Sequence, residues 1–125
     1  MNKNLKGIKR GFGQPDEVRE FKAHGHLDVL NFPDGTVVGR GVFEPGWKWS
    51  NDVKPIAGTD SCQAPHTGYV LSGHMHVVMD DGTEGDAGPG DAIIISPGHD
   101  AWIVGDEPCV VLDWSGAANY AKPAG

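Results

Sequence analysis

The sequence lacks long apolar runs and any excess of basic residues. Its 125 residues include 10 Lys and Arg against 17 Asp and Glu, giving a formal net charge of −7. A phosphate backbone would therefore meet net repulsion. No segment approaches the roughly 18 continuous apolar residues that cross a bilayer, and the basic N-terminus has no apolar stretch of the kind found in secretion signals. We expect no nucleic-acid partner, no membrane partner and a cytoplasmic location.

Cysteine is also scarce, and two common nucleotide-binding signatures are absent. Cys62 and Cys109 are too few for a disulfide framework, so we expect free thiols. The chain has no Gly-x-x-x-x-Gly-Lys-Ser/Thr loop and no Gly-x-Gly-x-x-Gly segment opening a helix. The length fits one domain.

Glycine and proline, by contrast, are abundant. With 19 Gly and 9 Pro, turns should be frequent and long helices rare. Short segments of strand formers lie between turns such as Pro33-Asp34-Gly35 and Ser72-Gly73. The predicted strands are residues 27–32, 36–43, 46–53, 68–71, 74–79, 92–96, 101–104 and 109–114. The apolar run Ala92 to Ile95 predicts a strand buried on both faces. The class is therefore all-β.

Outside the strands, the pattern predicts a short helical turn and two terminal segments. Pro15 favours a first helical position, so residues 16–21 are predicted to form a helical turn, and residues 54–65 an ordered loop. We place an N-terminal arm at residues 1–14, the domain at residues 15–116 and a polar tail at residues 117–125. The arm is suited to cover an edge strand of a second copy, which predicts a homodimer.

Two glycine-rich motifs resemble those of the cupin superfamily. They are Gly68-Tyr-Val-Leu-Ser-Gly73 and Gly88-Pro-Gly-Asp-Ala-Ile-Ile-Ile-Ser-Pro-Gly98. The resemblance implies a double-stranded β-helix, the jelly-roll barrel, with Asp91 accepting backbone hydrogen bonds in a turn. Three further strings look like a group of small bacterial single-domain cupins without a settled activity: residues 45–50, 66–73 and 96–108. That likeness implies a fold and an interior pocket.

The same resemblance implies one divalent transition metal, such as Zn, Ni, Fe or Mn, held by a His-x-His pair, a Glu and a further His. The family's Glu falls on His66, and its other positions fall on Thr59, Ser61 and Ala101. The candidate ligands are therefore His66, His99 and Cys62, with Asp60 or Asp100 as alternatives.

The pocket itself is expected to centre on His66. His66 alternates with Gly68 and Val70, so all three should point to the barrel interior. Trp47 and Trp49 also alternate, and tryptophan gives a pocket both apolar area and one N–H donor. The predicted ligand-pocket residues are His66, Tyr69, Trp47, Trp49 and Trp102. The alternative is a hydrogen-bonded interior histidine and tryptophans that pack in the core.

The remaining polar candidates are assigned to the surface. His74 and His76 lie opposite Met75 and Val77 on one strand, so they should face outward if the methionine faces inward. The pair His24 and His26 has no third ligand nearby in the sequence. Cys62 as a nucleophile has little support, because no partner His and Asp can be identified from sequence.

Three functions remain open. The first is a small-molecule-binding module, a sensor or accessory protein, with its pocket at His66 and with little or no metal; the missing ligands at Thr59, Ser61 and Ala101 argue for it. The second is a metal-dependent enzyme of dioxygenase or isomerase type, which the histidine at the Glu position keeps open. The third is a dimeric interaction module.

Overall fold

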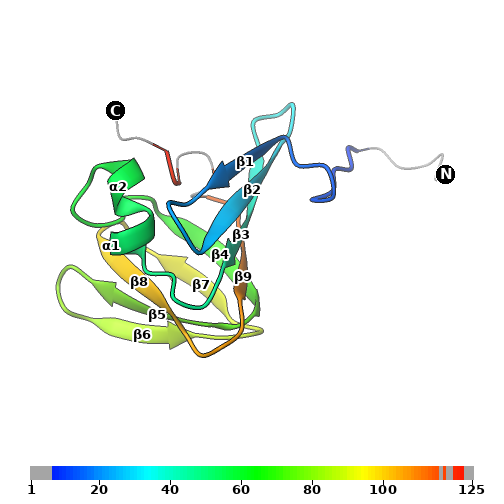
Figure 1. The fold of residues 1–125 in the computed structure, drawn as a ribbon. Helices are drawn as coiled ribbons and strands as arrows, with labels where there is room; N and C mark the ends of the chain where they lie inside the picture. The colour runs from blue at the N-terminus through cyan, green and yellow to red at the C-terminus, as the bar shows by residue number, and fades with distance from the viewer. Residues whose placement is uncertain (1–6, 116, 118–119, 123–125) are drawn as a thin grey trace.

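The computed structural model describes residues 7–115, 117 and 120–122 (Figure 1). Its elements are short and mostly extended. In chain order they are β1 (Glu17–Glu20), β2 (Gly25–Asn31), β3 (Val37–Phe43), α1 (Trp49–Asp52), α2 (Lys54–Ala57), β4 (His66–Ser72), β5 (His74–Met79), β6 (Glu84–Ala87), β7 (Ala92–Ile95), β8 (His99–Val104) and β9 (Cys109–Asp113). The predicted all-β class is confirmed.

The strands form two antiparallel sheets. One has six strands in the order β1-β2-β3-β9-β4-β7, and the other has three in the order β6-β5-β8. In Figure 1 the smaller sheet lies at the bottom of the view, while β1 and β2 rise at the upper right. From β4 onward the chain crosses repeatedly between the sheets, because β4, β7 and β9 belong to the larger sheet and β5, β6 and β8 to the smaller one.

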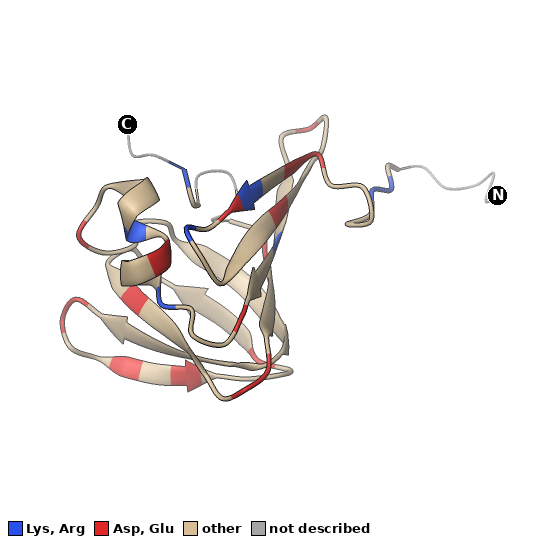
Figure 2. Ribbon diagram, viewed as in Figure 1, with Lys and Arg blue, Asp and Glu red and all other residues tan. Residues whose placement is uncertain are grey.

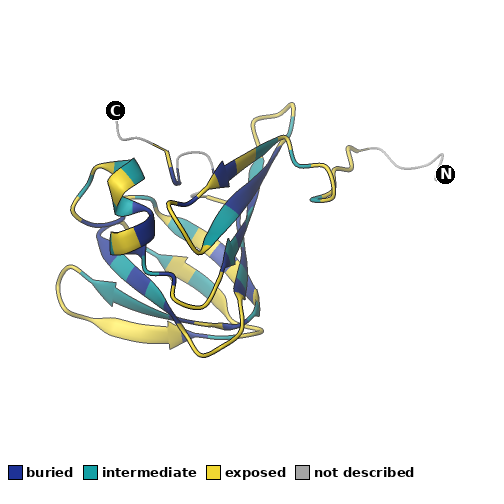
Figure 3. Ribbon diagram, in the orientation of Figure 1, coloured by how far each residue is buried: buried dark blue, intermediate teal, exposed yellow. Residues whose placement is uncertain are grey.

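The core lies between the sheets because alternate residues of each strand face it. In β8 the buried residues are His99, Ala101 and Ile103, and in β9 they are Cys109, Val111 and Asp113. Burial in Figure 3 follows the same alternation, with β6 mostly exposed. Two of these inward positions carry polar side chains, His99 and Asp113, which places chemistry inside an otherwise apolar core.

Three local predictions in the first half of the chain are wrong. Residues 17–20 form strand β1, because they pair with β2 in the register Glu17↔Val29, and this pairing overrides the helical signal of Pro15 and Asp16. The predicted strand 46–53 instead contains α1, and α2 lies inside the predicted loop 54–65. Pro55 in the first turn of α2 suits a helix start.

Two further corrections concern the edges of the sheets. Strand β7 lies at an edge of the six-stranded sheet, next to β4. It is not buried on both faces, because its residues alternate between exposed and half-buried, with Ile94 84% exposed. Strand β6 was not predicted, because Glu84-Gly-Asp-Ala87 contains no strong strand former. It forms by pairing with β5 in the register Met75↔Ala87.

The terminal segments are described only in part. Residues 1–6 of the predicted arm and residues 116, 118–119 and 123–125 lie outside the described part of the chain. Within the predicted tail, Ala117, Tyr120 and Ala121 are buried against the barrel. The domain boundaries stay predictions. Among the described residues, no helix has the length and apolar character needed to cross a bilayer.

Candidate functional site

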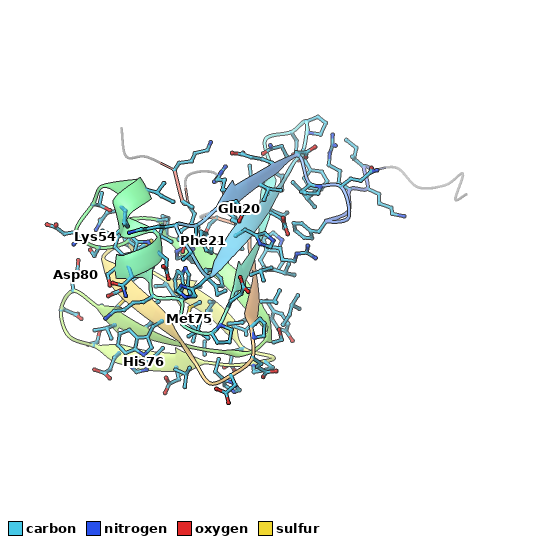
Figure 4. The ribbon with its side chains drawn as sticks, in the orientation of Figure 1. Glu20, Phe21, Lys54, Met75, His76 and Asp80 are labelled. Atoms are coloured by element: carbon cyan, nitrogen blue, oxygen red, sulfur yellow. The ribbon has the colours of Figure 1, made fainter. Side chains whose placement is uncertain are left out.

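A small apolar cavity of about 50 Å³ lies between the two sheets. Its walls come mainly from the inward faces of β3, β4, β5, β7, β8 and β9. The lining residues are Leu27, Gly41, Phe43, Trp47, Trp49, His66, Gly68, Met75, Val77, Ile93, Ile95, His99, Ala101, Val111, Asp113 and Tyr120. Figure 4 shows Met75 on the inner side of β5 and His76 on its outer side.

Three metal-binding side chains converge at one wall of this cavity. One ligand atom from each of Cys62, His66 and His99 lies within 4.8 Å of the other two. His66 begins β4 and His99 begins β8. Cys62 is brought to them by the backbone, since its N–H donates to the His99 carbonyl at 2.8 Å and its own carbonyl accepts from Gly98 at 2.7 Å.

His66 bridges the cysteine and a buried carboxylate. Its Nδ1 is hydrogen-bonded to Asp113 of β9, and its Nε2 lies 3.7 Å from Cys62 Sγ. Asp113 is in place because β9 pairs with β4 in the register Gly68↔Asp113, and its second oxygen accepts from the Ser115 N–H. The result is a Cys62–His66–Asp113 chain across three segments of the fold.

This chain shifts the ionisation of both inner groups. Burial lowers the pKa of His66, but the hydrogen bonds with Asp113 and Cys62 outweigh it and raise the pKa to about 9. Burial raises the pKa of Cys62, yet the hydrogen bonds with His66 and His99 outweigh that and lower it to about 6. Near neutral pH the metal-free site therefore holds an imidazolium and a thiolate.

His99 is oriented by its own backbone partner. Its Nδ1 lies 2.9 Å from the carbonyl of Ser96 and donates to it, which leaves Nε2 as the ring nitrogen available to Cys62 or to a metal ion. The family pattern placed a histidine at Ala101, two residues further along β8. Because side chains alternate along a strand, residues 99 and 101 share the inward face, so the displaced imidazole still enters the cavity.

The C-terminal segment covers the polar end of the cavity. The ring of Tyr120 packs edge-on to that of His66, with centroids 5.3 Å apart, and also against Phe21 at 5.9 Å. Burial, followed by the negative charges of Cys62 and Asp113, raises the pKa of Tyr120 well above its ordinary value. Buried Arg19 holds this segment by donating to the carbonyls of Ala117 and Tyr120, each at 2.7 Å.

We expect Arg19→Ala to loosen the cover over Cys62. Two charge-assisted hydrogen bonds are lost and two carbonyls lose their donor, which should cost about 2–4 kcal/mol of unfolding free energy. Cys62 should then react faster with a disulfide reagent, measured by labelling and mass spectrometry. Arg40→Ala is the matched control, because the Arg40 guanidinium on β3 donates instead to the Asp28 carboxylate on β2. Equal labelling rates in the two variants would contradict the covering role.

The tryptophans divide between cavity and surface. Trp47 and Trp49 line the cavity and are each 2% exposed. Trp102 does not line it. On β8 its side chain points outward, with its ring centroid 4.9 Å from that of His76 and 5.2 Å from the Lys48 ammonium. Tyr69 is also outside, because it lies on the outward face of β4 and is 39% exposed. The predicted pocket residues Tyr69 and Trp102 are therefore corrected.

The alternative carboxylate ligands are not in the cluster. Asp60 is exposed and lies 4.0 Å from the Lys54 ammonium. Asp100 points away from the cavity, where its Oδ1 accepts from the Ser50 and Ala101 backbone N–H groups. Ser61, at one family ligand position, donates instead to Asp80.

The other histidines lie away from the cavity. His74 is exposed, and His76 interacts with Glu84 and Asp86 on the acidic strand β6 (Figure 2). His24 binds Asp52, and His26 lies 3.4 Å from Asp28. Three of them, His24, His26 and His76, contact carboxylates instead. Asp91 accepts from the Gly88 N–H at 2.8 Å, as expected for a turn residue.

Sequence reasoning missed Asp113 and Tyr120. Asp113 ends the apolar strand Cys109-Val-Val-Leu-Asp113, and its alternation with Cys109 and Val111 was a usable signal for an inward carboxylate. Tyr120 carried no such signal, because it follows the last strand and is placed by contacts with Arg19, Phe21 and His66, which are far from it in the sequence.

The donor set of the site fits a divalent transition metal. A thiolate and two imidazoles suit zinc and its neighbours. Around such an ion, donor atoms stand about 3.5 Å apart, close to the 3.7 Å between Cys62 Sγ and His66 Nε2. The other ring nitrogen of each histidine is hydrogen-bonded to an oxygen, that of His66 to the Asp113 carboxylate and that of His99 to the Ser96 carbonyl. Metal-binding histidines usually have such a hydrogen bond at the nitrogen that does not bind the metal. Three protein ligands would leave coordination positions open.

A family model described as "Cupin domain" matches residues 61–115. The matched segment contains Cys62, His66, His99 and Asp113. Among curated proteins there is no significant match.

Solved structures similar to this chain share its architecture. An RmlC-like cupin from Shewanella frigidimarina superposes with a TM-score of 0.59 at 19% identity, covering 89% of this chain and 93% of that one. A conserved protein with a double-stranded β-helix domain from Klebsiella pneumoniae has a TM-score of 0.58 at 19% identity, over 96% and 93%. A tryptophan-to-tyrosine variant of oxalate decarboxylase from Bacillus subtilis reaches 0.59 at 14% identity, over 94% of this chain and 31% of that one. These likenesses establish the jelly-roll fold.

Proposed function

We propose that this chain, whose residues 61–115 match a cupin family model and whose fold is the double-stranded β-helix, is a metal-dependent protein in which Cys62, His66 and His99 hold one divalent transition ion at the wall of the barrel cavity. The ion would face a space lined mostly by apolar side chains. When bound, it supplies Lewis acidity and open coordination positions for a small molecule.

The observation that carries this proposal is the convergence of three soft or borderline donors with oriented outer partners. Carboxylate-rich surface clusters are common without a metal. Here, in contrast, a thiol and two imidazoles come together inside the protein, with Cys62 and His99 each 3% exposed. Burying such polar groups is costly unless they are paired; Asp113 and Ser96 pair one nitrogen of each histidine, and a metal ion would bind the other nitrogens together with the Cys62 sulfur.

Metal titration with cobalt(II) and zinc(II) tests the proposal. In chelator-treated protein, we expect one cobalt ion per chain with a sulfur-to-cobalt charge-transfer band. Cys62→Ser should abolish the band and weaken zinc binding by at least about 100-fold, beyond the 10–100-fold typical of losing an outer partner. Zinc affinity follows from competition with a chelating dye.

The controls lie in the same chain. Cys109→Ser changes the other buried thiol, which is outside the cluster, and His74→Ala changes an exposed histidine. Both should keep the wild-type spectrum and stoichiometry. A band that survives Cys62→Ser, or binding of less than one ion per chain, would overturn the proposal. It would then favour the metal-free small-molecule module expected from the missing ligands at Thr59 and Ala101.

A second candidate function rests on the Cys62–His66–Asp113 chain. In the absence of metal, the same contacts make Cys62 a nucleophile whose thiolate is stabilised by an imidazole that a carboxylate orients. The two functions compete for one sulfur atom. Zinc that protects Cys62 from iodoacetamide favours the metal site, whereas a rapid alkylation that zinc does not change favours the nucleophile. Homodimerisation and a cytoplasmic location stay predictions.

A further inference from the structure

One buried hydrogen-bond donor in the cavity wall has no partner. Trp47 is 2% exposed, and its indole Nε1 has no hydrogen-bond acceptor. Among the described residues it is the one buried side-chain nitrogen or oxygen without a hydrogen-bond partner. Trp47 lines the same cavity as His66 and His99. Buried donors are nearly always satisfied, so this exception points to an acceptor supplied from outside the chain.

The position of Trp47 is fixed by its backbone and its neighbours. The backbone N–H of Trp47 donates to the Glu44 carbonyl at 3.0 Å, and the backbone carbonyl of Trp47 accepts from the Ile103 N–H at 3.0 Å. Its ring packs edge-on to Phe43 at 4.5 Å and tilted to Phe21 at 6.0 Å. An indole clamped in this way cannot turn to find another acceptor without breaking these contacts.

A single water molecule is a poor partner for this donor. An ordered buried water needs two to four polar contacts, but the rings beside Trp47 are those of Phe43 and Phe21. An oxygen that belongs to an organic ligand needs fewer hydrogen bonds, because the rest of the ligand contacts the apolar wall.

The cavity also limits the size of the ligand. A volume of about 50 Å³, at about 10–15 Å³ for each water in the same measure, holds roughly four non-hydrogen atoms. The walls beyond the polar cluster are apolar, with Leu27, Met75 and Val77 among them.

We infer that the cavity binds a short-chain carbonyl or carboxylate compound whose oxygen accepts a hydrogen bond from Trp47 Nε1. This rests on the proposed function only in sharing its cavity; it names the substrate class and does not require the metal ion. Trp47 is then the residue that selects ligands with an oxygen acceptor over apolar molecules of the same size.

Nuclear magnetic resonance of the indole N–H group tests the inference. In ¹⁵N-labelled, chelator-treated protein, acetone and acetate serve as acceptor probes and xenon as an apolar probe. Addition of acetone or acetate should move the Trp47 indole proton downfield and leave that of Trp102 unchanged. Trp47→Phe should weaken binding of the acceptor probes by about tenfold, with xenon binding changed less than twofold. Trp49→Phe, the other cavity tryptophan, is the matched control.

Each result decides the question. Acceptor probes that leave the Trp47 signal unmoved overturn the inference, as does equal affinity of wild type and Trp47→Phe, or an indole that stays bonded to water at saturating probe. If Trp47→Phe does not fold, the wild-type indole shift alone decides. Metal binding without an indole shift overturns this inference only, and an indole shift without metal binding overturns the metal proposal only.

Discussion

Asp113→Asn is expected to raise the pKa of the Cys62 thiol from about 6 back toward 9 in metal-free protein. Burial raises the pKa of Cys62, and the hydrogen bonds with His66 and His99 lower it. Asp113 acts through His66, because its carboxylate keeps that imidazole protonated, with a pKa of about 9. An asparagine side chain is neutral and cannot do this, so the thiolate loses its counter-charge.

Thiolate absorbance in the ultraviolet, followed against pH, measures this change. In a Cys109→Ser background the signal comes from Cys62 alone. The alkylation rate at pH 7 should fall by roughly tenfold or more in Asp113→Asn, because only the thiolate reacts. Asp86→Asn is the matched control, since Asp86 pairs with the outward-facing His76. A midpoint that is the same in Asp113→Asn and wild type would show that Asp113 does not act on the thiol.

The free energy of unfolding should depend only weakly on the ionisation of His66 and Cys62 between pH 6 and 9. The pKa of His66 is raised on folding, so its stabilisation is full below pH 6.5 and is lost as pH rises through about 9. The pKa of Cys62 is lowered, so its stabilisation is full above pH 9.0 and is lost as pH falls through about 6. One contribution replaces the other between pH 6 and 9, which makes their sum nearly constant.

Gly73→Ala is expected to have the largest effect on stability. Gly73 joins β4 to β5 with φ of +74°, a conformation that costs other residues about 1–2 kcal/mol. A Cβ there would also lie 2.4 Å from both the Cys109 Cα and the Pro108 carbonyl oxygen. These are backbone atoms of a neighbouring segment and cannot rotate away. We expect a loss of more than about 4 kcal/mol, measured by chemical denaturation.

Gly82→Ala separates the two causes. Gly82 also has a positive φ, +88°, but a Cβ there would meet nothing within 4 Å. Its substitution should cost only the conformational strain, about 1–2 kcal/mol. If the two variants lose the same stability, the close approach of the β4–β5 turn to residues 108 and 109 is unimportant.

Much of the fold was predictable because its signals are local. Alternation placed His66, Gly68 and Val70 on the inward face of β4, and Gly68 and Val70 are indeed buried. Turn glycines marked the reversals at residues 35, 73 and 82, all with positive φ. The predictions failed at β1, β6 and residues 46–53, where strand pairing or packing overrode the local preference of the sequence. Residues 17–20, for example, are a strand because they pair with β2.

From the sequence alone follow the all-β class, the inward direction of His66 and the loss of the family's other ligands at Thr59, Ser61 and Ala101. Only the tertiary structure decided that Cys62, His99 and Asp113 meet His66. These residues come from a loop and three strands separated by up to 51 positions, and their meeting depends on the bridge Cys62↔His99 and the register Gly68↔Asp113. Alternation sets the direction of a side chain, but strand register sets its neighbours, and register depends on non-local pairing.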